Sequence, residues 1–406
     1  MRSGIRRSRR RHNKGMIALL GGIVAVFVII LIAVGIKFAI SGWSPAGGND
    51  GQKEDEANKV LVTDIQVTCD RPVVRAGEPI QLNVSVAPEN ATDKTVKWTI
   101  SGDMGSVDEK GVFTPAVEAG KSDVEVTATS NDGTEVFGSV TIRVLEAVDP
   151  SKPMVAITYD DGPHKTNTQK LLDILEENYA VATFFMVGQN IEGKEDIVRR
   201  SYNLGNEMGS HTWDHENLTK VGEDTIKKQL EDTDAAIKAV VNVENPILRP
   251  PFGAFNDRVK SVCGKPIIMW SVDTMDWSTR SADKTYEACM GAQDGDIILM
   301  HDIHEPTIVA AEDIIKGLQA KGFQLVTVTE LYEYRMGDFG PGKANYKMTL
   351  DEYNRILAEQ AAASTENQET DSTDSTGDGT AANSSEAGTE AGNGSTENPD
   401  TPVSNG

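Results

Sequence analysis

Cysteine is scarce in this sequence, and its scarcity argues against two kinds of protein. The chain of 406 residues has three cysteines, Cys69, Cys263 and Cys289, and none of them forms a CxxC pair. A sparse, odd count excludes a disulfide framework, and the missing CxxC pairs argue against a structural zinc site. Cys263 and Cys289 could pair in an oxidising compartment, or both could be buried free thiols. Cysteine therefore leaves the compartment undecided.

Positive charge is also in short supply. The chain has 39 Lys and Arg against 62 Asp and Glu, which gives a formal net charge of −23. Residues 1–15 carry seven Lys or Arg and no carboxylate, whereas residues 359–406 carry ten carboxylates and no Lys or Arg. An acidic body repels phosphate backbones, which argues against nucleic acid as a partner, while a neutral glycan needs no basic patch.

Long uncharged runs are missing except over residues 16–36. A helix of that length, at about 1.5 Å per residue, spans a hydrocarbon core of about 30 Å. The basic cytoplasmic arm over residues 1–15 sets the orientation. A cleaved signal peptide is the alternative, but its apolar region is shorter and ends at a small-x-small site. We expect a single transmembrane helix over residues 16–40 that anchors an extracellular body in the cell membrane.

The next two segments differ in character. Residues 41–60 are rich in Gly, Asp, Glu and Asn, which predicts a flexible linker. Residues 61–147 contain short runs of alternating apolar and polar side chains, which predict a small all-β sandwich with Trp98 in its core. The segment resembles bacterial Ig-like domains of group 2 at residues 96–98, 105–107, 110–115 and 138–144. It contains no His, and we expect a spacer rather than a glycan-adhesion unit.

Residues 150–340 alternate apolar strand-like runs with amphipathic helical stretches. Such alternation predicts an α/β domain with parallel strands, and its catalytic residues should follow strand C-termini. Strands are expected at 153–158, 182–187, 247–248, 266–270, 297–300 and 323–328, and helices at 168–178, 222–241 and 306–321. Residues 341–358 could form a short helix. Residues 359–406 lack aromatic side chains, so we expect a disordered acidic tail.

Three features of this domain carry chemistry. Adjacent carboxylates, Asp160 and Asp161, follow a predicted strand, although Asp-Gly-Pro is also ordinary turn chemistry. His211 and His215 are four residues apart, so one helical turn or a tight loop can bring both to one metal, with Asp161 as a third ligand. His301 closes a buried strand, where it could donate a proton or simply be a structural residue.

Residues 150–337 resemble the polysaccharide deacetylases of carbohydrate esterase family four. The family's five motifs occur in order, at 158–163, 211–215, 249–253, 273–277 and 299–301. Each motif is weak alone, but five at suitable separations are specific. Tyr159 stands where the family usually has Phe, and Phe252 where Tyr is common. The resemblance implies an irregular (β/α) barrel with fewer units than the regular eight.

The resemblance also implies a role for each matching residue. Asp161, His211 and His215 would bind a divalent metal, with zinc expected first and cobalt, nickel, iron or manganese as alternatives. Catalysis would use Asp160 as general base, held by Arg249, and His301 as general acid, oriented by Asp276. The backbone N–H of Phe252 would help to stabilise the oxyanion, and Phe252, Trp277 and Leu299 would form the walls of the acetyl pocket.

The leading functional hypothesis is a metal-dependent hydrolase that removes N-acetyl groups from N-acetylglucosamine residues of peptidoglycan. Its partner would be the acetylated cell-wall glycan. An O-acetyl xylan esterase or a chitin-oligomer deacetylase is the second enzymatic hypothesis, since the same site serves both. A catalytically inactive wall-binding adhesion protein is the alternative of another class, and the intact motifs argue against it.

Overall fold

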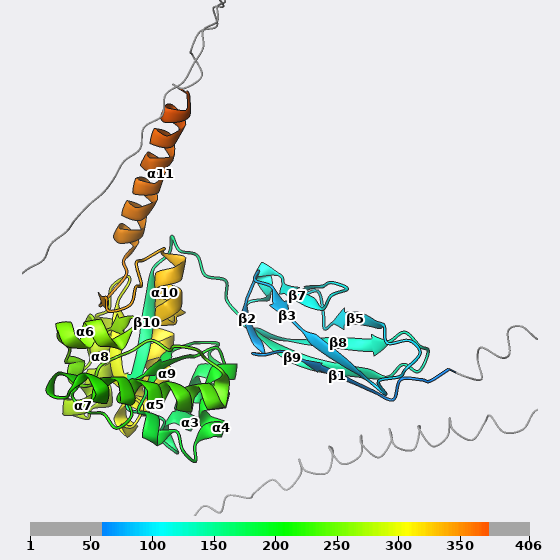
Figure 1. Cartoon of the computed structure of the whole chain (residues 1–406), viewed down its shortest axis with the longest axis horizontal. Coiled ribbons are helices and arrows are strands. Elements are labelled where there is room, and N and C mark those ends of the chain that lie inside the picture. The colour runs from blue at the N-terminus through cyan, green and yellow to red at the C-terminus, as the bar shows by residue number, and fades with distance from the viewer. Residues whose placement is uncertain (1–58, 373–406) are drawn as a thin grey trace, which may run out of the picture. The chain divides into compact units, whose positions relative to one another are not determined.

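The structure is a computed structural model and describes residues 59–372 (Figure 1). The predicted basic arm, the helix predicted over residues 16–40, nearly all of the predicted linker and the end of the acidic tail lie outside the described residues. All three cysteines are described, and each is a free thiol. The pairing considered for Cys263 and Cys289 is therefore not formed.

The predicted fold class requires one correction, which concerns its transmembrane helix. Within residues 59–372, no helix has both the length and the apolar composition needed to cross a membrane. The two longest helices there, α5 (Glu223–Val241) and α11 (Leu350–Ser372), carry charged side chains along their length, which excludes them from a hydrocarbon core. Over residues 59–372, the fold supported is an α/β domain together with an Ig-like β domain.

The Ig-like domain is built from short strands, as predicted. Its three sheets have the orders β2-β9-β8-β5, β3-β7-β6 and β1-β4. The strands are β1 (Asp64–Thr68), β2 (Val73–Arg75), β3 (Ile80–Gln81), β4 (Asn83–Ala87), β5 (Val96–Ile100), β6 (Gly105–Val107), β7 (Val112–Pro115), β8 (Ser122–Ser130) and β9 (Phe137–Leu145). Phe113, Val124 and Ile142 are fully buried in the core, and Trp98 packs half-buried against it.

The α/β domain is organised around a central strand, β10. The parallel sheet has the order β12-β11-β10-β15-β14, and β16 pairs with the start of β10. Its strands are β10 (Met154–Asp160), β11 (Thr183–Met186), β12 (Glu207–Ser210), β14 (Val272–Asp273), β15 (Ile297–His301) and β16 (Gln324–Val326). Single bridges from Ser210 to Leu248 and from Leu248 to Ile267 connect β12 towards β13 (Ile267–Ile268).

Helices follow most of these strands, as expected where parallel strands need crossover connections. They are α3 (Asn167–Glu177), α4 (Glu195–Asn203), α5, α6 (Asp257–Cys263), α7 (Asp276–Thr279), α8 (Ala282–Met290), α9 (Glu305–Ala320) and α10 (Val328–Tyr334). Strand β17 (Ala344–Asn345) pairs with β13, and α11 follows it. The segment predicted as a separate short helix over 341–358 thus contributes a strand before its helix begins.

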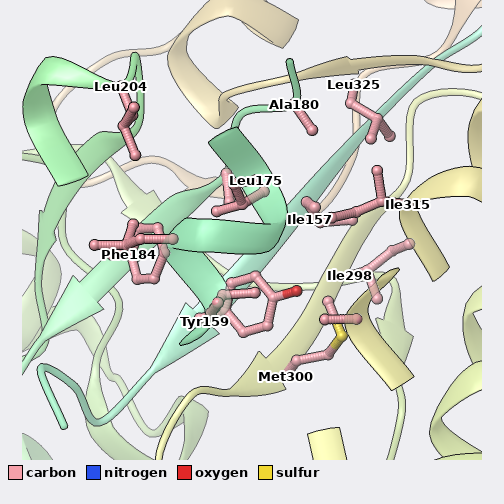
Figure 2. Close-up of a cluster of buried hydrophobic side chains, with 14 of the residues drawn as sticks. Ile157, Tyr159, Leu175, Ala180, Phe184, Leu204, Ile298, Met300, Ile315 and Leu325 are labelled. Atoms are coloured by element: carbon pink, nitrogen blue, oxygen red, sulfur yellow. The ribbon is translucent and has the colours of Figure 1, made fainter. Parts of the chain in front are cut away.

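The side chains of β10 alternate between two faces of the sheet, and only one of these faces leads to the candidate site. Ile157 and Tyr159 lie in the cluster beneath the helices, with Leu175, Phe184 and other apolar side chains (Figure 2). Met154 and Ala156 belong to another buried cluster. Because strand side chains alternate between faces, Thr158 and Asp160 continue this second face towards the carboxyl end of the strand. The strand therefore places the Asp160 carboxylate at the edge of the sheet where the candidate site residues lie.

Candidate metal and catalytic site

The candidate site residues come from loops at the carboxyl ends of neighbouring parallel strands. Asp160 ends β10 and Asp161 follows it, His211 follows β12, and His301 ends β15. Register places Asp160 directly opposite His301. Residues far apart in sequence are thereby brought together at one edge, which is where parallel α/β folds place their sites.

Three side chains form a candidate metal centre. One donor atom from each of Asp161, His211 and His215 lies within 4.8 Å of the others. Asp161 Oδ1 is 3.5 Å from His211 Nε2 and 3.4 Å from His215 Nε2. This carboxylate oxygen is buried and has no hydrogen-bond partner in the described structure. A buried, unpaired carboxylate oxygen beside two imidazole nitrogens fits a divalent cation, which would satisfy all three atoms.

His211 is held in the tautomer that a metal ligand needs. Its Nδ1 lies 2.7 Å from the carbonyl oxygen of Arg249, so Nδ1–H donates and Nε2 keeps its lone pair. Burial lowers the pKa of His211 to about 3, so the imidazole is neutral near pH 7. A neutral ring with a free Nε2 is ready to coordinate without first losing a proton.

Backbone strain is concentrated at this centre. Asp161, Thr212 and His215 have φ values of 72°, 66° and 64°. Non-glycine residues seldom adopt this left-handed region, and for a β-branched residue such as Thr212 it is a clear outlier. Each such residue costs on the order of 1–3 kcal/mol. The stability of the surrounding fold offsets this strain, which occurs in the segments that position the candidate ligands.

The base side of the site is a buried ion pair. Asp160 Oδ1 accepts a hydrogen bond of 2.7 Å from Nη1 of Arg249, and both side chains are nearly inaccessible to solvent. Arg249 also donates to Thr158 Oγ1 and to the carbonyl oxygens of Ile268 and Met269. Burial raises the pKa of the Asp160 carboxyl, against the opposing effect of the guanidinium. The other oxygen, Oδ2, is 3.8 Å from His211 Nε2 and so lies beside the metal centre.

The acid side joins His301 to Asp276. Asp276 Oδ1 is 2.8 Å from His301 Nδ1, and its Oδ2 accepts the backbone N–H of His301 and the hydroxyl of Thr307. Burial acts against protonation of His301, but the hydrogen bond to Asp276 and the charge of Asp160 outweigh it and raise the imidazole pKa. With Nδ1 committed to Asp276, Nε2 is the atom left to exchange a proton with a substrate.

The three candidate metal ligands, Asp160 and His301 line one cavity of about 420 Å³. Phe252 and Trp277 are 66% and 47% exposed and Leu299 is 4% exposed, so two exposed aromatic rings and one buried aliphatic side chain contribute to its apolar lining. Phe252 has φ 63° and packs edge-on against the His215 ring at 4.6 Å between centroids. Every site residue predicted from the sequence borders this cavity or, for Arg249 and Asp276, supports a residue that does.

Several contributors were not predicted. Thr158 binds Arg249, Thr307 binds Asp276, and Asp273 and Trp270 line the cavity. Threonines carry no spacing signal, and Thr307 becomes a partner only because α9 packs beside α7. Asp273 and Trp270 did offer a signal, since they follow or end a predicted strand. Neither residue was assigned a role from the sequence.

Comparison with known proteins gives two family matches. The model for polysaccharide deacetylase matches residues 147–265, and the model for the bacterial Ig-like domain (group 2) matches residues 61–137. The second match agrees with the β-sandwich, and the first covers the candidate metal ligands, Asp160 and Arg249.

Three curated relatives illustrate the similarity. Peptidoglycan-N-acetylmuramic acid deacetylase PdaC of Bacillus subtilis is 37% identical over 191 residues, which are 47% of this chain and 41% of the relative. Peptidoglycan-N-acetylglucosamine deacetylase PgdA of Listeria monocytogenes is 39% identical over 179 residues, 44% of this chain and 38% of the relative. A peptidoglycan-N-acetylglucosamine deacetylase of Bacillus cereus is 35% identical over 191 residues, 45% of this chain and 70% of the relative. The chain thus spans about two fifths of the first two relatives.

Proposed function

Because the chain belongs to the polysaccharide deacetylase family, we propose that it hydrolyses N-acetyl groups of a cell-wall polysaccharide with the help of a divalent metal. The observation that carries the proposal is that members of three groups line one cavity. These are the Asp161, His211 and His215 ligand set, the Asp160–Arg249 pair and the His301–Asp276 pair.

Amide hydrolysis needs an activated water, a polarised carbonyl and a proton for the leaving amine. Asp161, His211 and His215 would hold the metal, and when bound it would lower the pKa of a water from about 15.7 towards about 7 and polarise the acetyl carbonyl. Zinc suits two imidazoles, one carboxylate and open positions, so we propose zinc, with cobalt, nickel, iron and manganese as alternatives.

The residues of the chain move the protons. Asp160 accepts a proton from the attacking water, and Arg249 keeps the carboxyl oriented through the reaction. His301 gives a proton from Nε2 to the sugar nitrogen as the carbon–nitrogen bond breaks, which releases acetate and a free amine. Asp276 stabilises the charged imidazolium before this transfer. The Phe252 N–H is proposed to bind the carbonyl oxygen, and Trp277, Phe252 and Leu299 to enclose the acetyl methyl.

We propose N-acetylglucosamine of peptidoglycan as the substrate. The first three relatives described above act on peptidoglycan sugars by name. The lining of the cavity contains Asp160, Asp161 and Asp273 but no Lys or Arg, so it suits an uncharged sugar better than a stem-free muramic acid, whose lactyl carboxylate would meet like charges. Such a substrate places the working enzyme outside the cytoplasm, at the wall. Chitin oligomers and O-acetylated xylan are the competing substrates.

The first test separates metal binding from proton transfer. Asp161→Ala and His215→Ala should each lose bound metal and turnover together, because a three-ligand site rarely survives the loss of one ligand. Asp160→Asn should keep the metal but lose at least 10²-fold in kcat, on the order expected for one general base, because an amide cannot accept the proton of the water. Asp196→Asn, on the exposed face of α4, is the matched control.

Metal content is measured by elemental analysis. Acetate release is measured with four substrates: N-acetylglucosamine tetramer, stem-free wall strands, chitin and acetylated xylan. Loss of metal in Asp160→Asn would move Asp160 into the ligand set. Absence of acetate release from every N-acetylated glycan by the metal-loaded wild type would reject the proposed function and favour the wall-binding alternative.

A further inference from the structure

Asp273 lines the catalytic cavity and has no part in the mechanism above. It ends β14, whose register places it opposite Leu299 of β15. It therefore lies on the strand next to the one that His301 ends, three residues before α7 begins. Its side chain is half-buried.

The two carboxylate oxygens of Asp273 have different surroundings. Oδ1 accepts the backbone N–H of Met275 at 2.9 Å, which fixes the side chain over a turn where Met275 has φ 54°. In the described part of the chain, no donor and no cationic side chain contacts Oδ2. The result is a carboxylate held in place by the backbone, with one oxygen still available as an acceptor.

The other carboxylates in the cavity are already committed. Asp160 is bound by Arg249, and Asp161 lies between His211 and His215. Apart from Pro250 and Gly253, the rest of the lining consists of aromatic, aliphatic and imidazole side chains. A sugar presents several hydroxyl donors around its acetamido group, and a hydroxyl bound to a carboxylate makes one of the stronger hydrogen bonds in proteins.

We propose that Asp273 is a specificity residue whose Oδ2 accepts a hydroxyl of the sugar ring that carries the acetyl group. This inference rests on the proposed function, since it concerns the same cavity and substrate class. Asp273 would thereby distinguish an acetylated sugar from an acetyl compound without ring hydroxyls.

If Asp273 had only a structural role, it would stabilise the turn at Met275. Two substitutions distinguish this structural role from the proposed role in substrate recognition. Asp273→Asn keeps an oxygen for the Met275 N–H but turns the second acceptor atom into an NH₂ donor. Asp273→Ala removes both functions. Asp257→Asn, at an exposed position that begins α6, is the matched control.

The experiment compares an N-acetylglucosamine tetramer with 4-nitrophenyl acetate, which has no ring hydroxyls. For Asp273→Asn we expect kcat/KM on the tetramer to fall roughly 10- to 100-fold, as for loss of one hydrogen bond to a charged group, with an unchanged Tm. Hydrolysis of 4-nitrophenyl acetate should stay within about twofold. A loss of equal size on both substrates, or on neither, would overturn the inference.

Binding supplies a second measurement that needs no turnover. Titration of metal-loaded Asp160→Asn protein with the tetramer, followed by tryptophan fluorescence, should give a Kd that rises about tenfold or more when Asp273→Asn is added. An unchanged Kd would overturn the inference. Wild-type protein that binds the tetramer but releases no acetate would reject the proposed function while still leaving the Kd comparison decisive for Asp273.

Discussion

Tyr159 stands between Thr158 and Asp160 on β10 and faces the opposite way from both. Its ring stacks on Phe184 at 5.5 Å between centroids, inside the cluster of Figure 2 that also contains Ile298 and Met300. The side chain is 1% exposed, and its hydroxyl has no hydrogen-bond partner in the described structure. Burial raises the pKa of this hydroxyl well above its ordinary value, so it stays neutral.

Removal of this hydroxyl should therefore stabilise the protein. A buried polar group without a partner costs about 1–3 kcal/mol, and Tyr159→Phe deletes it with little change in shape. We expect a Tm rise of several degrees with unchanged kcat, measured by thermal unfolding. Tyr332→Phe is the matched control, because the Tyr332 hydroxyl donates to the carbonyl of Lys347 at 3.0 Å and its removal should destabilise. A Tm decrease in Tyr159→Phe would show that the hydroxyl is satisfied in solution.

At the residue scale, the metal centre was the part most open to prediction from sequence. The spacing of His211 and His215 and the position of Asp161 after a strand carry their own signal, and the structure brings the three together. The supporting groups could not be predicted in the same way. Thr158 and Thr307 act through hydroxyls whose partners are defined only when Arg249 and Asp276 pack against them.

At the element scale, long apolar or amphipathic segments were predicted well and short polar ones were missed. The strands expected at 153–158 and 182–187 correspond to β10 and β11, and the helix expected at 222–241 corresponds to α5. Strand β12 was not predicted, since Glu-Met-Gly-Ser has no hydrophobic run. It forms because β11 supplies a parallel partner along its whole length.

The position of the candidate general acid, His301, depends on contacts among three elements: α7, β15 and α9. Asp276 is the first residue of α7, His301 the last of β15, and Thr307 lies in the first turn of α9. Asp276 accepts hydrogen bonds from both partners, so one carboxylate fixes the position of the strand end against two helices. This arrangement has a consequence for the pH dependence of the reaction.

A general acid must be protonated, so activity should fall as pH rises through the pKa of His301. Asp276 and Asp160 raise that pKa in spite of burial, so the alkaline limb of kcat/KM should lie above about 6.5, the ordinary histidine value. Asp276→Asn removes the main raising cause, so the limb should move to lower pH. Profiles are measured on the tetramer at saturating metal, with Asp196→Asn as control. An unmoved limb in Asp276→Asn would assign it to another group.

At the scale of the whole molecule, the described residues from 61 to 372 belong to one compact unit. Within it, Arg75 of β2 forms an ion pair of 2.8 Å with Glu330 of α10, and the two side chains are 8% and 23% exposed. Glu330 also completes the capping box of α10 with Thr327. Arg75 of the Ig-like domain thus neutralises the charge of Glu330, whose carboxylate caps the first turn of α10 in the α/β domain.

Loss of this counter-charge should cost stability. Arg75→Met leaves Glu330 largely buried without its partner, for which we expect a loss of up to about 3 kcal/mol, whereas Lys121→Met breaks the exposed Lys121–Glu146 pair at a cost of about 0–1 kcal/mol. Denaturant unfolding measures both. The double variant Arg75→Met, Glu330→Gln should recover part of the loss. Equal effects of the two single variants would show that the Arg75–Glu330 pair contributes no more than a surface pair.

Residues beyond the boundary predicted at residue 340 contact the α/β domain. Strand β17 pairs with β13, and Met348 is 3% exposed. Arg335, which is fully buried, donates to Asp294 and to the carbonyl of Met348, and Asp294 Oδ2 also accepts the N–H of Leu350. The strand Ala344–Asn345 was not predicted because it is too short and too polar to give a strand signal.

Chains that share one N-terminus but end at residues 340, 358 and 406 test this boundary. A chain ending at 340 loses β17, and Arg335 loses the Met348 carbonyl, so a buried guanidinium is left partly unsatisfied. We expect it to be less stable by about 3 kcal/mol or more in denaturant unfolding, on the order of a broken buried polar network. A chain ending at 358 keeps these contacts and should match the full chain within about 0.5 kcal/mol. The metal ligands, Asp160 and His301 all precede residue 340, so the folded fraction of the shortest chain should keep its kcat. Equal unfolding midpoints for the chains ending at 340 and 358 would place the true boundary where the sequence put it.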